Sequence, residues 1–117
     1  VWLDDERERN YAISCARWIG DYVDPSTFLD MFISNSGNNA TGWSSPDYDR
    51  LVRGAASETD AARRYAMLQE AEAILLREAP IAPLYHGTRP YLIHPAVKGW
   101  EPALLGFHRY QRVSLQP

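Results

Sequence analysis

The sequence has little of what cross-linked or membrane-spanning proteins need. Its 117 residues include a single cysteine, Cys15, which excludes an internal disulfide and a cysteine-built zinc site. Cys15 lies in an apolar stretch and is expected to be a small core residue. No apolar run is long enough to cross a bilayer, and no basic and then apolar leader opens the chain. What remains is an ordinary globular composition that by itself identifies no function.

Catalytic and metal-binding motifs are also missing. The chain has no G-x-S-x-G elbow, no phosphate-binding P-loop and no G-x-G-x-x-G dinucleotide motif. Its three histidines, His86, His94 and His108, are spaced as in no common metal site. We therefore predict that the protein is not an enzyme and carries no catalytic residue, metal or cofactor.

Charge is weakly negative and unevenly distributed. Fifteen acids and twelve bases give a net charge of −3, which argues against a nucleic-acid partner. Residues 1–86 hold fourteen of the acids and eight of the bases, whereas residues 87–117 hold one acid and four bases. The sign of the net charge therefore changes after His86.

Three helices are predicted. A short apolar helix over 26–32 follows Pro25, which can start a helix. Ser45 and Pro46 are typical of an N-cap and a first helical residue, and they predict a helix to about residue 56. Thr59 or Asp60 caps a longer helix that continues to about Glu78, with Pro80 ending it. An apolar stripe at helical spacing marks its buried face: Ala61, Tyr65, Met67, Leu68, Ala71, Ile74 and Leu75.

Strands are predicted on both sides of these helices. The segment 11–18 has the composition of a buried strand. Shorter strands are predicted over 81–85, 91–93 and 112–115, and prolines confine the first two to sheet edges or ends. Residues 34–45 form a polar loop of unusual length. The mixture indicates an α/β protein.

An indole and a carboxylate lie three residues apart where the first predicted strand ends. Asp21 could pair with an ammonium group, and Trp18 could form a wall against the rest of a ligand. The pattern alone slightly favours a structural alternative, in which the indole packs in the core and the aspartate caps the following turn.

Several ordered segments resemble one family. W-I-G-D-Y-x-D-P-x-T-F-L-D-M-F begins at Trp18, and S-x-S-G-N-N and T-G-W-S-S-P-D-Y-D-R-L follow it. R-x-x-x-L-Q-E-A-E-A-I-L-L-x-E-A-P-I-A-P-L-Y-H, V-K-G-W and G-F-H come later. From about Tyr11 to Leu115 the chain resembles the C-terminal part of the oligopeptide- and dipeptide-binding proteins of peptide-type ABC transporters (family 5 of the bacterial extracellular solute-binding proteins).

The resemblance implies a fragment of a two-lobe, periplasmic-binding-protein-like fold, with a mixed sheet and flanking helices. Residues 1–86 would be the C-terminal piece of the second, ligand-binding lobe, and residues 87–117 a segment that returns to the first lobe after the hinge. The implied function is extracytoplasmic (periplasmic) capture of peptides between the lobes and delivery to the membrane subunits of an ABC permease. The missing leader would then belong to preceding sequence.

The resemblance also implies ligand contacts. Asp21 would pair with the free α-amino group of the peptide, and Trp18 would be the aromatic wall beside it. The backbone of Arg17 and Ile19 would lie along the peptide as an added strand. His86, near the hinge, is a further candidate for ligand contact.

Alternatives remain at this point. The same family could bind a non-peptide solute such as a nickel complex or a sugar. The chain could instead be a self-contained helical interaction module that uses the stripe from Tyr65 to Leu75, or a hydrolase using Asp21 or Asp24 with His86 or His108. A fragment with uncovered sheet edges is also expected to associate with itself and to bind peptide weakly or not at all.

Overall fold

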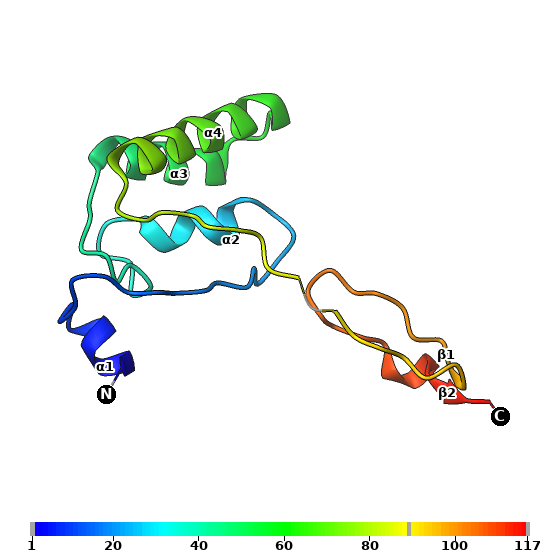
Figure 1. Cartoon of the computed structure of the whole chain (residues 1–117). Helices are drawn as coiled ribbons and strands as arrows, with labels where there is room; N and C mark the ends of the chain where they lie inside the picture. Colours follow the sequence, from blue (N-terminus) through cyan, green and yellow to red (C-terminus); the bar gives the residue numbers. More distant parts are fainter. Residues whose placement is uncertain (1, 89, 117) are drawn as a thin grey trace. The chain divides into compact units, whose positions relative to one another are not determined.

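A computed structural model of the chain describes residues 2–88 and 90–116. The chain divides into two compact units, Val1–Pro83 and Leu84–Pro117. The first unit contains helices α1 (Trp2–Arg7), α2 (Ser26–Leu29), η1 (Asp30–Phe32), α3 (Pro46–Ser57) and α4 (Ala61–Glu78) (Figure 1). The second contains β1 (Val97–Lys98), η2 (Tyr110–Arg112) and β2 (Ser114–Leu115).

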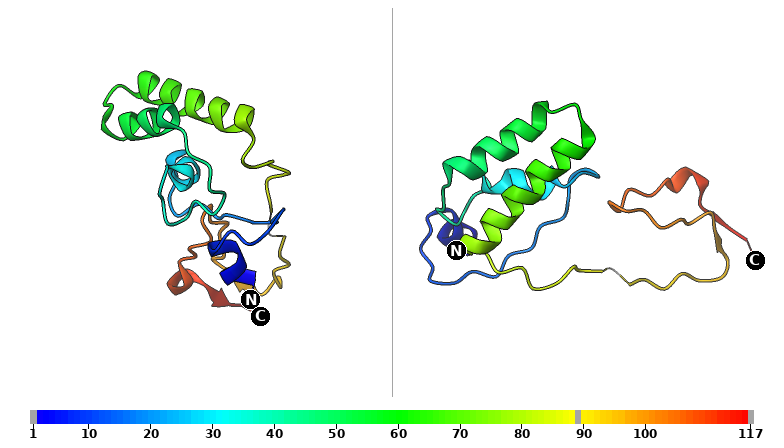
Figure 2. Two further views of the ribbon diagram at one scale, coloured as in Figure 1. Left: turned by 90° about the vertical axis from the view of Figure 1, so that its left-hand side faces the viewer. Right: turned by 90° about the horizontal axis from the view of Figure 1, so that it is seen from above.

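Helices α3 and α4 form an antiparallel hairpin whose ends follow the sequence signals. Ser45 accepts a hydrogen bond from the Tyr48 backbone N–H at 3.5 Å, and Asp60 accepts one from the Arg63 N–H at 2.8 Å. Ala79 ends α4 in the left-handed region at φ 51°, where its N–H reaches the Leu75 carbonyl. The two helices lie side by side in both orthogonal views (Figure 2). All three predicted helices are therefore confirmed.

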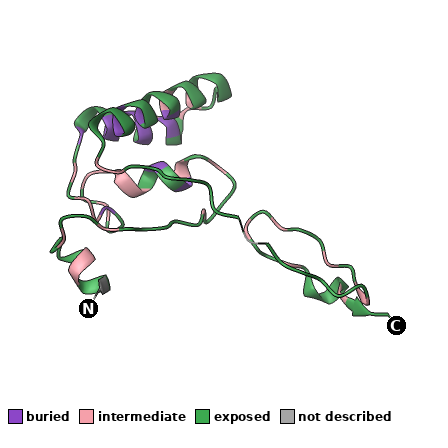
Figure 3. Ribbon diagram, viewed as in Figure 1, coloured by how far each residue is buried: buried purple, intermediate pink, exposed green. Residues whose placement is uncertain are grey.

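The hydrophobic core lies between this hairpin and α2 (Figure 3). The predicted stripe is confirmed at Leu68, Ala71, Ile74 and Leu75, which are buried, but Ala61 and Tyr65 are exposed. Tyr48 is fully buried, and its hydroxyl donates to the Leu29 carbonyl at 2.6 Å. Burial raises the pKa of the Tyr48 hydroxyl, which keeps this group a donor. The core and this bond fix α2 to the hairpin.

Buried polar side chains organise the long loop before α3. Asn39 donates to the carbonyls of Phe32 and Trp43, at 3.2 and 3.0 Å, and its Oδ1 accepts from Thr41. Asp49 in α3 accepts from the Ser34 N–H at 2.9 Å. These bonds give the loop a fixed conformation although it contains no repeating structure.

The strand predictions were largely wrong. Residues 11–18, 81–85 and 91–93 form no strand, and within residues 2–88 and 90–116 the sheet is one antiparallel pair with Val97 opposite Leu115. A strand exists only when a neighbour supplies hydrogen bonds, and the described part of the chain supplies none to 11–18. Cys15 is accordingly exposed rather than buried in the core. Only the last predicted strand is confirmed, in part, as Ser114–Leu115.

The second unit has little interior. None of its described residues is buried, and Leu84, Leu92 and Phe107 are each at least 79% exposed. A cluster of rings, Tyr91, Trp100, His108 and Tyr110, provides its main internal packing. Among the described residues, no helix has the length and apolar character needed to span a membrane.

We predict that Tyr48→Phe lowers the free energy of unfolding by about 1–3 kcal/mol, because the buried Leu29 carbonyl loses its donor. Urea denaturation followed by circular dichroism measures this change. Tyr22→Phe is the matched control, since it removes a hydroxyl from an exposed ring and is expected to change stability by less than about 0.5 kcal/mol. Equal losses in the two variants would contradict this role of the Tyr48 hydroxyl.

Candidate functional site

The candidate site is the segment 17–22, which precedes α2. Arg17 and Asp21 are exposed, Ile19 is 51% exposed and Trp18 is 38% exposed. These four predicted site residues therefore stand on one accessible stretch of chain. His86 is exposed in the Leu84–Pro117 unit, outside the unit that contains the other four.

Thr27, the second residue of α2, holds this segment. The Trp18 Nε1–H donates to the Thr27 carbonyl at 3.1 Å, and the Asp21 backbone N–H donates to Thr27 Oγ1 at 2.9 Å. A Cβ at Gly20 would approach Thr27 Cγ2 to 3.1 Å, so the lack of a side chain there permits close contact with α2. The segment is thus attached to the helix at successive points.

The Asp21 carboxylate takes no part in this attachment. Within the part of the chain that the structure describes, it makes no hydrogen bond and no ion pair. Asp24, not Asp21, caps the turn, since its Oδ1 accepts from the Ser26 N–H at 2.9 Å and the Ser26 hydroxyl at 2.7 Å. The indole of Trp18 also lies outside the hydrophobic core cluster. The indole therefore does not pack in the core, and Asp21 does not cap the turn, so the structural alternative is absent on both counts.

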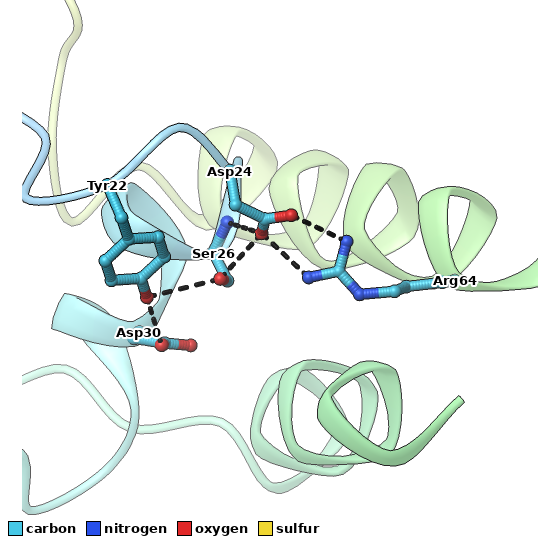
Figure 4. Close-up of polar contacts among 5 residues, drawn as sticks. All are labelled: Tyr22, Asp24, Ser26, Asp30 and Arg64. Carbon is cyan, nitrogen blue, oxygen red and sulfur yellow. Dashed lines mark hydrogen bonds and ion pairs between the residues drawn. The ribbon is translucent and has the colours of Figure 1, made fainter. Parts of the chain in front are cut away.

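Asp24, in the turn between the site segment and α2, forms a two-bond ion pair with Arg64 of α4 (Figure 4). The guanidinium donates to the two carboxylate oxygens at 2.7 and 2.8 Å, and both side chains are less than a third exposed. Arg64 and Ser26 hold the pKa of the Asp24 carboxyl well below its ordinary value near 3.8. The same pairing raises the pKa of the Arg64 guanidinium. Sequence reasoning missed Arg64, because no local pattern relates residues that are 40 positions apart.

Further polar contacts surround this ion pair. The Tyr22 hydroxyl lies 3.2 Å from Ser26 Oγ and donates to Asp30 at 3.1 Å (Figure 4). No group of three or more His, Cys, Asp or Glu side chains that could hold a metal ion occurs in residues 2–88 and 90–116. The arrangement presents the unpaired Asp21 carboxylate and the Trp18 indole on a loop that is held to α2 by hydrogen bonds. Its chemistry suits recognition of a cation joined to an apolar or extended group.

Comparison with known proteins assigns the chain to a class. No family model matches it. The substrate-binding domain of an oligopeptide ABC transporter from Bacillus anthracis aligns with a TM-score of 0.86 at 35% identity, over 98% of this chain and 23% of that one. The chain therefore has the structure of a segment of the two-lobe periplasmic-binding-protein fold.

Sequence relatives define the family more narrowly. The dipeptide-binding protein DppE of Bacillus subtilis is 35% identical over 99 residues, covering 85% of this chain and 18% of DppE. The probable deoxycholate-binding periplasmic protein YgiS of Escherichia coli is also 35% identical, over 86% of this chain and 19% of YgiS. The homologues of the chain over this segment are oligopeptide- and dipeptide-binding proteins. It spans about a fifth of the length of these relatives.

We predict that the Asp24–Arg64 pair makes unfolding sensitive to acid. Because the folded-state pKa of Asp24 is depressed, its stabilisation is complete above the unfolded value near 3.8 and is lost as the pH falls from there toward the folded value. Asp24→Asn should therefore reduce the melting temperature strongly at about pH 6 and much less at about pH 2. Thermal unfolding of both proteins across this range measures the difference.

The matched control is Asp47→Asn, which removes a carboxylate paired with Arg50 at 3.4 Å on an exposed surface. Exposed pairs contribute little, so this variant should unfold like the unmodified chain at every pH. An Asp24→Asn effect that stayed constant with pH would contradict the ion-pair explanation.

Proposed function

We propose that the complete protein captures peptides outside the cytoplasm and delivers them to the membrane subunits of an ABC importer. In this proposal it binds its ligand and does not convert it. The observation that carries the proposal is the Asp21 carboxylate, which is exposed and unpaired within the described chain, three residues from the exposed Trp18 indole. The peptide-binding relatives support the choice of ligand class.

The chemistry requires a fixed carboxylate at such a site. A peptide enclosed between two lobes brings a charged α-ammonium group away from water, and an unpaired buried charge is very costly. Asp21 would pair with this group, and Trp18 would cover the adjoining part of the peptide. Neutralising the ligand's charged end in this way is independent of the peptide's side chains.

The backbone beside Asp21 suits an extended ligand. No backbone–backbone hydrogen bond within the described residues involves positions 11–20. Arg17 and Ile19 would therefore contact the peptide through their free N–H and C=O groups, as an added strand does. His86 is included as a further contact on the resemblance alone.

We also propose that residues 1–86 end the second lobe and that residues 87–117 return to the first lobe. The absence of any buried residue among the described positions of the Leu84–Pro117 unit supports this division, because such a segment needs a larger body to cover its apolar side chains. Self-association of the segment when isolated stays a prediction.

A non-peptide cargo is the second candidate. YgiS, which is 35% identical to this chain as DppE is, is described as a probable deoxycholate-binding protein. A bile-acid anion brings no ammonium group, so Asp21 would repel it rather than bind it. Direct competition between deoxycholate and peptides for the complete receptor distinguishes the two cargo classes.

We predict that Asp21→Asn in the complete receptor weakens binding of a free-amine tripeptide by about 10- to 100-fold, the equivalent of about 1.5–3 kcal/mol for a lost charge-assisted bond. The probe is the tightest binder from a tripeptide pool, measured by calorimetry. Its N-acetyl derivative lacks the ammonium group and should bind weakly to both proteins. Asp47→Asn is the control for loss of one exposed negative charge. Unchanged affinity for the free-amine tripeptide would remove Asp21 from the site.

We predict that amide hydrogens of residues 84–116 exchange rapidly in the isolated 117-residue chain and slowly in the complete receptor, because only the complete protein covers their apolar side chains. Hydrogen–deuterium exchange with mass spectrometry measures both, and the core of α3 and α4 is the internal reference. Equal protection in the two proteins would contradict the proposed return to a larger lobe.

A further inference from the structure

Thr27 lies between the candidate site and the helical core. It is 4% exposed, although its neighbour Phe28 is 49% exposed. Its carbonyl accepts from the Trp18 indole, its hydroxyl oxygen accepts from the Asp21 N–H, and its methyl faces Gly20. One buried residue therefore contacts the Trp18 indole, the Asp21 backbone and Gly20, which precedes Asp21.

The element that carries Thr27 is itself fixed. The Thr27 N–H donates to the Asp24 carbonyl at 3.2 Å, and the Asp24 side chain binds Arg64 of α4 (Figure 4). On its other side, the Leu29 carbonyl accepts from the buried Tyr48 of α3. Thr27 thus connects residues 18–21 to a braced helix, as a precise binding site requires.

The Asp21 carboxylate gains its position only through its backbone. The Asp21 side chain makes no hydrogen bond or ion pair within the described chain. The hydrogen bond from the Asp21 N–H to Thr27 Oγ1 is therefore the contact that holds Asp21 in place. We propose that Thr27 is a positioning residue, which places the Asp21 carboxylate and the Trp18 indole relative to each other for binding the charged end of a ligand. This inference rests on the proposed function, since it assumes that Asp21 receives an ammonium group.

Two substitutions separate the hydroxyl from the rest of the side chain. Thr27→Val keeps the shape and the methyl group but removes the acceptor for the Asp21 N–H. Thr27→Ser keeps the acceptor and removes the methyl that faces Gly20. The carbonyl that holds Trp18 is present in both variants. Compared with the unmodified receptor, the Val variant therefore reports the loss of the hydroxyl and the Ser variant reports the loss of the methyl group.

The test uses the complete receptor, with the free-amine tripeptide and its N-acetyl derivative as calorimetric probes. The Val variant should bind the free-amine tripeptide about three- to tenfold more weakly, since one hydrogen bond that orients Asp21 is lost. Its affinity for the acetylated tripeptide should be unchanged, and the Ser variant should bind both like the unmodified receptor. A merely structural role would weaken both probes in equal proportion, and that result would overturn the proposal.

Failure of the inference is distinguishable from failure of the proposed function. If Asp21→Asn weakens the free-amine tripeptide selectively but Thr27→Val does not, Thr27 has no positioning role and the proposed function stands. If the unmodified receptor does not prefer the free-amine probe, both fail. Should the Val variant not fold, Thr27→Ala against Thr27→Ser gives the same comparison of the hydroxyl, and equal affinities in that pair would overturn the proposal.

Discussion

The ion pair between Asp24 and Arg64 is the interaction on which the arrangement of the site depends. It joins the loop before α2 to the first turn of α4, 40 positions later, through two short bonds. The same carboxylate accepts two hydrogen bonds from Ser26, the first residue of α2, so loss of Asp24 would loosen both the helix start and its attachment to α4. A partly enclosed pair of this geometry is expected to contribute more than the exposed Asp47–Arg50 pair on α3.

The site is therefore a loop supported through α2 by the helical hairpin. Tyr48 and Arg64 hold α2 from the two helices of the hairpin, and Thr27 transmits that position to residues 18–21. The bonded groups face the protein, whereas the Asp21 carboxylate and much of the Trp18 indole remain accessible. An unpaired carboxylate is costly only when it is dehydrated, so the exposed Asp21 carboxylate does not destabilise the folded chain.

Local signals in the sequence predicted the helices well. They predicted strand pairing and burial poorly, because these depend on contacts between distant residues. Ser45, Pro46 and Asp60 act on their own helix ends, and their roles were readable without knowledge of the rest of the chain. The segment 11–18 has the composition of a strand, but pairing depends on a neighbour that the described residues do not supply. For the same reason Cys15, expected in a core, is exposed.

The site was predictable only in part. The resemblance directed attention to Asp21 and Trp18, whereas residue pattern alone slightly favoured a capping role that belongs to Asp24. Thr27 and Arg64 gave no signal, since a threonine in a short helix and an arginine on a long one are ordinary. Their importance follows from contacts that exist only in the folded chain.

The most direct test is a crystal structure of the complete receptor with a tripeptide bound. We expect the peptide's α-nitrogen about 2.7–2.9 Å from an oxygen of Asp21, with the Trp18 indole against the adjoining backbone. A bound peptide whose α-nitrogen contacts a different acid, with the Asp21 carboxylate directed to solvent, would contradict the central claim.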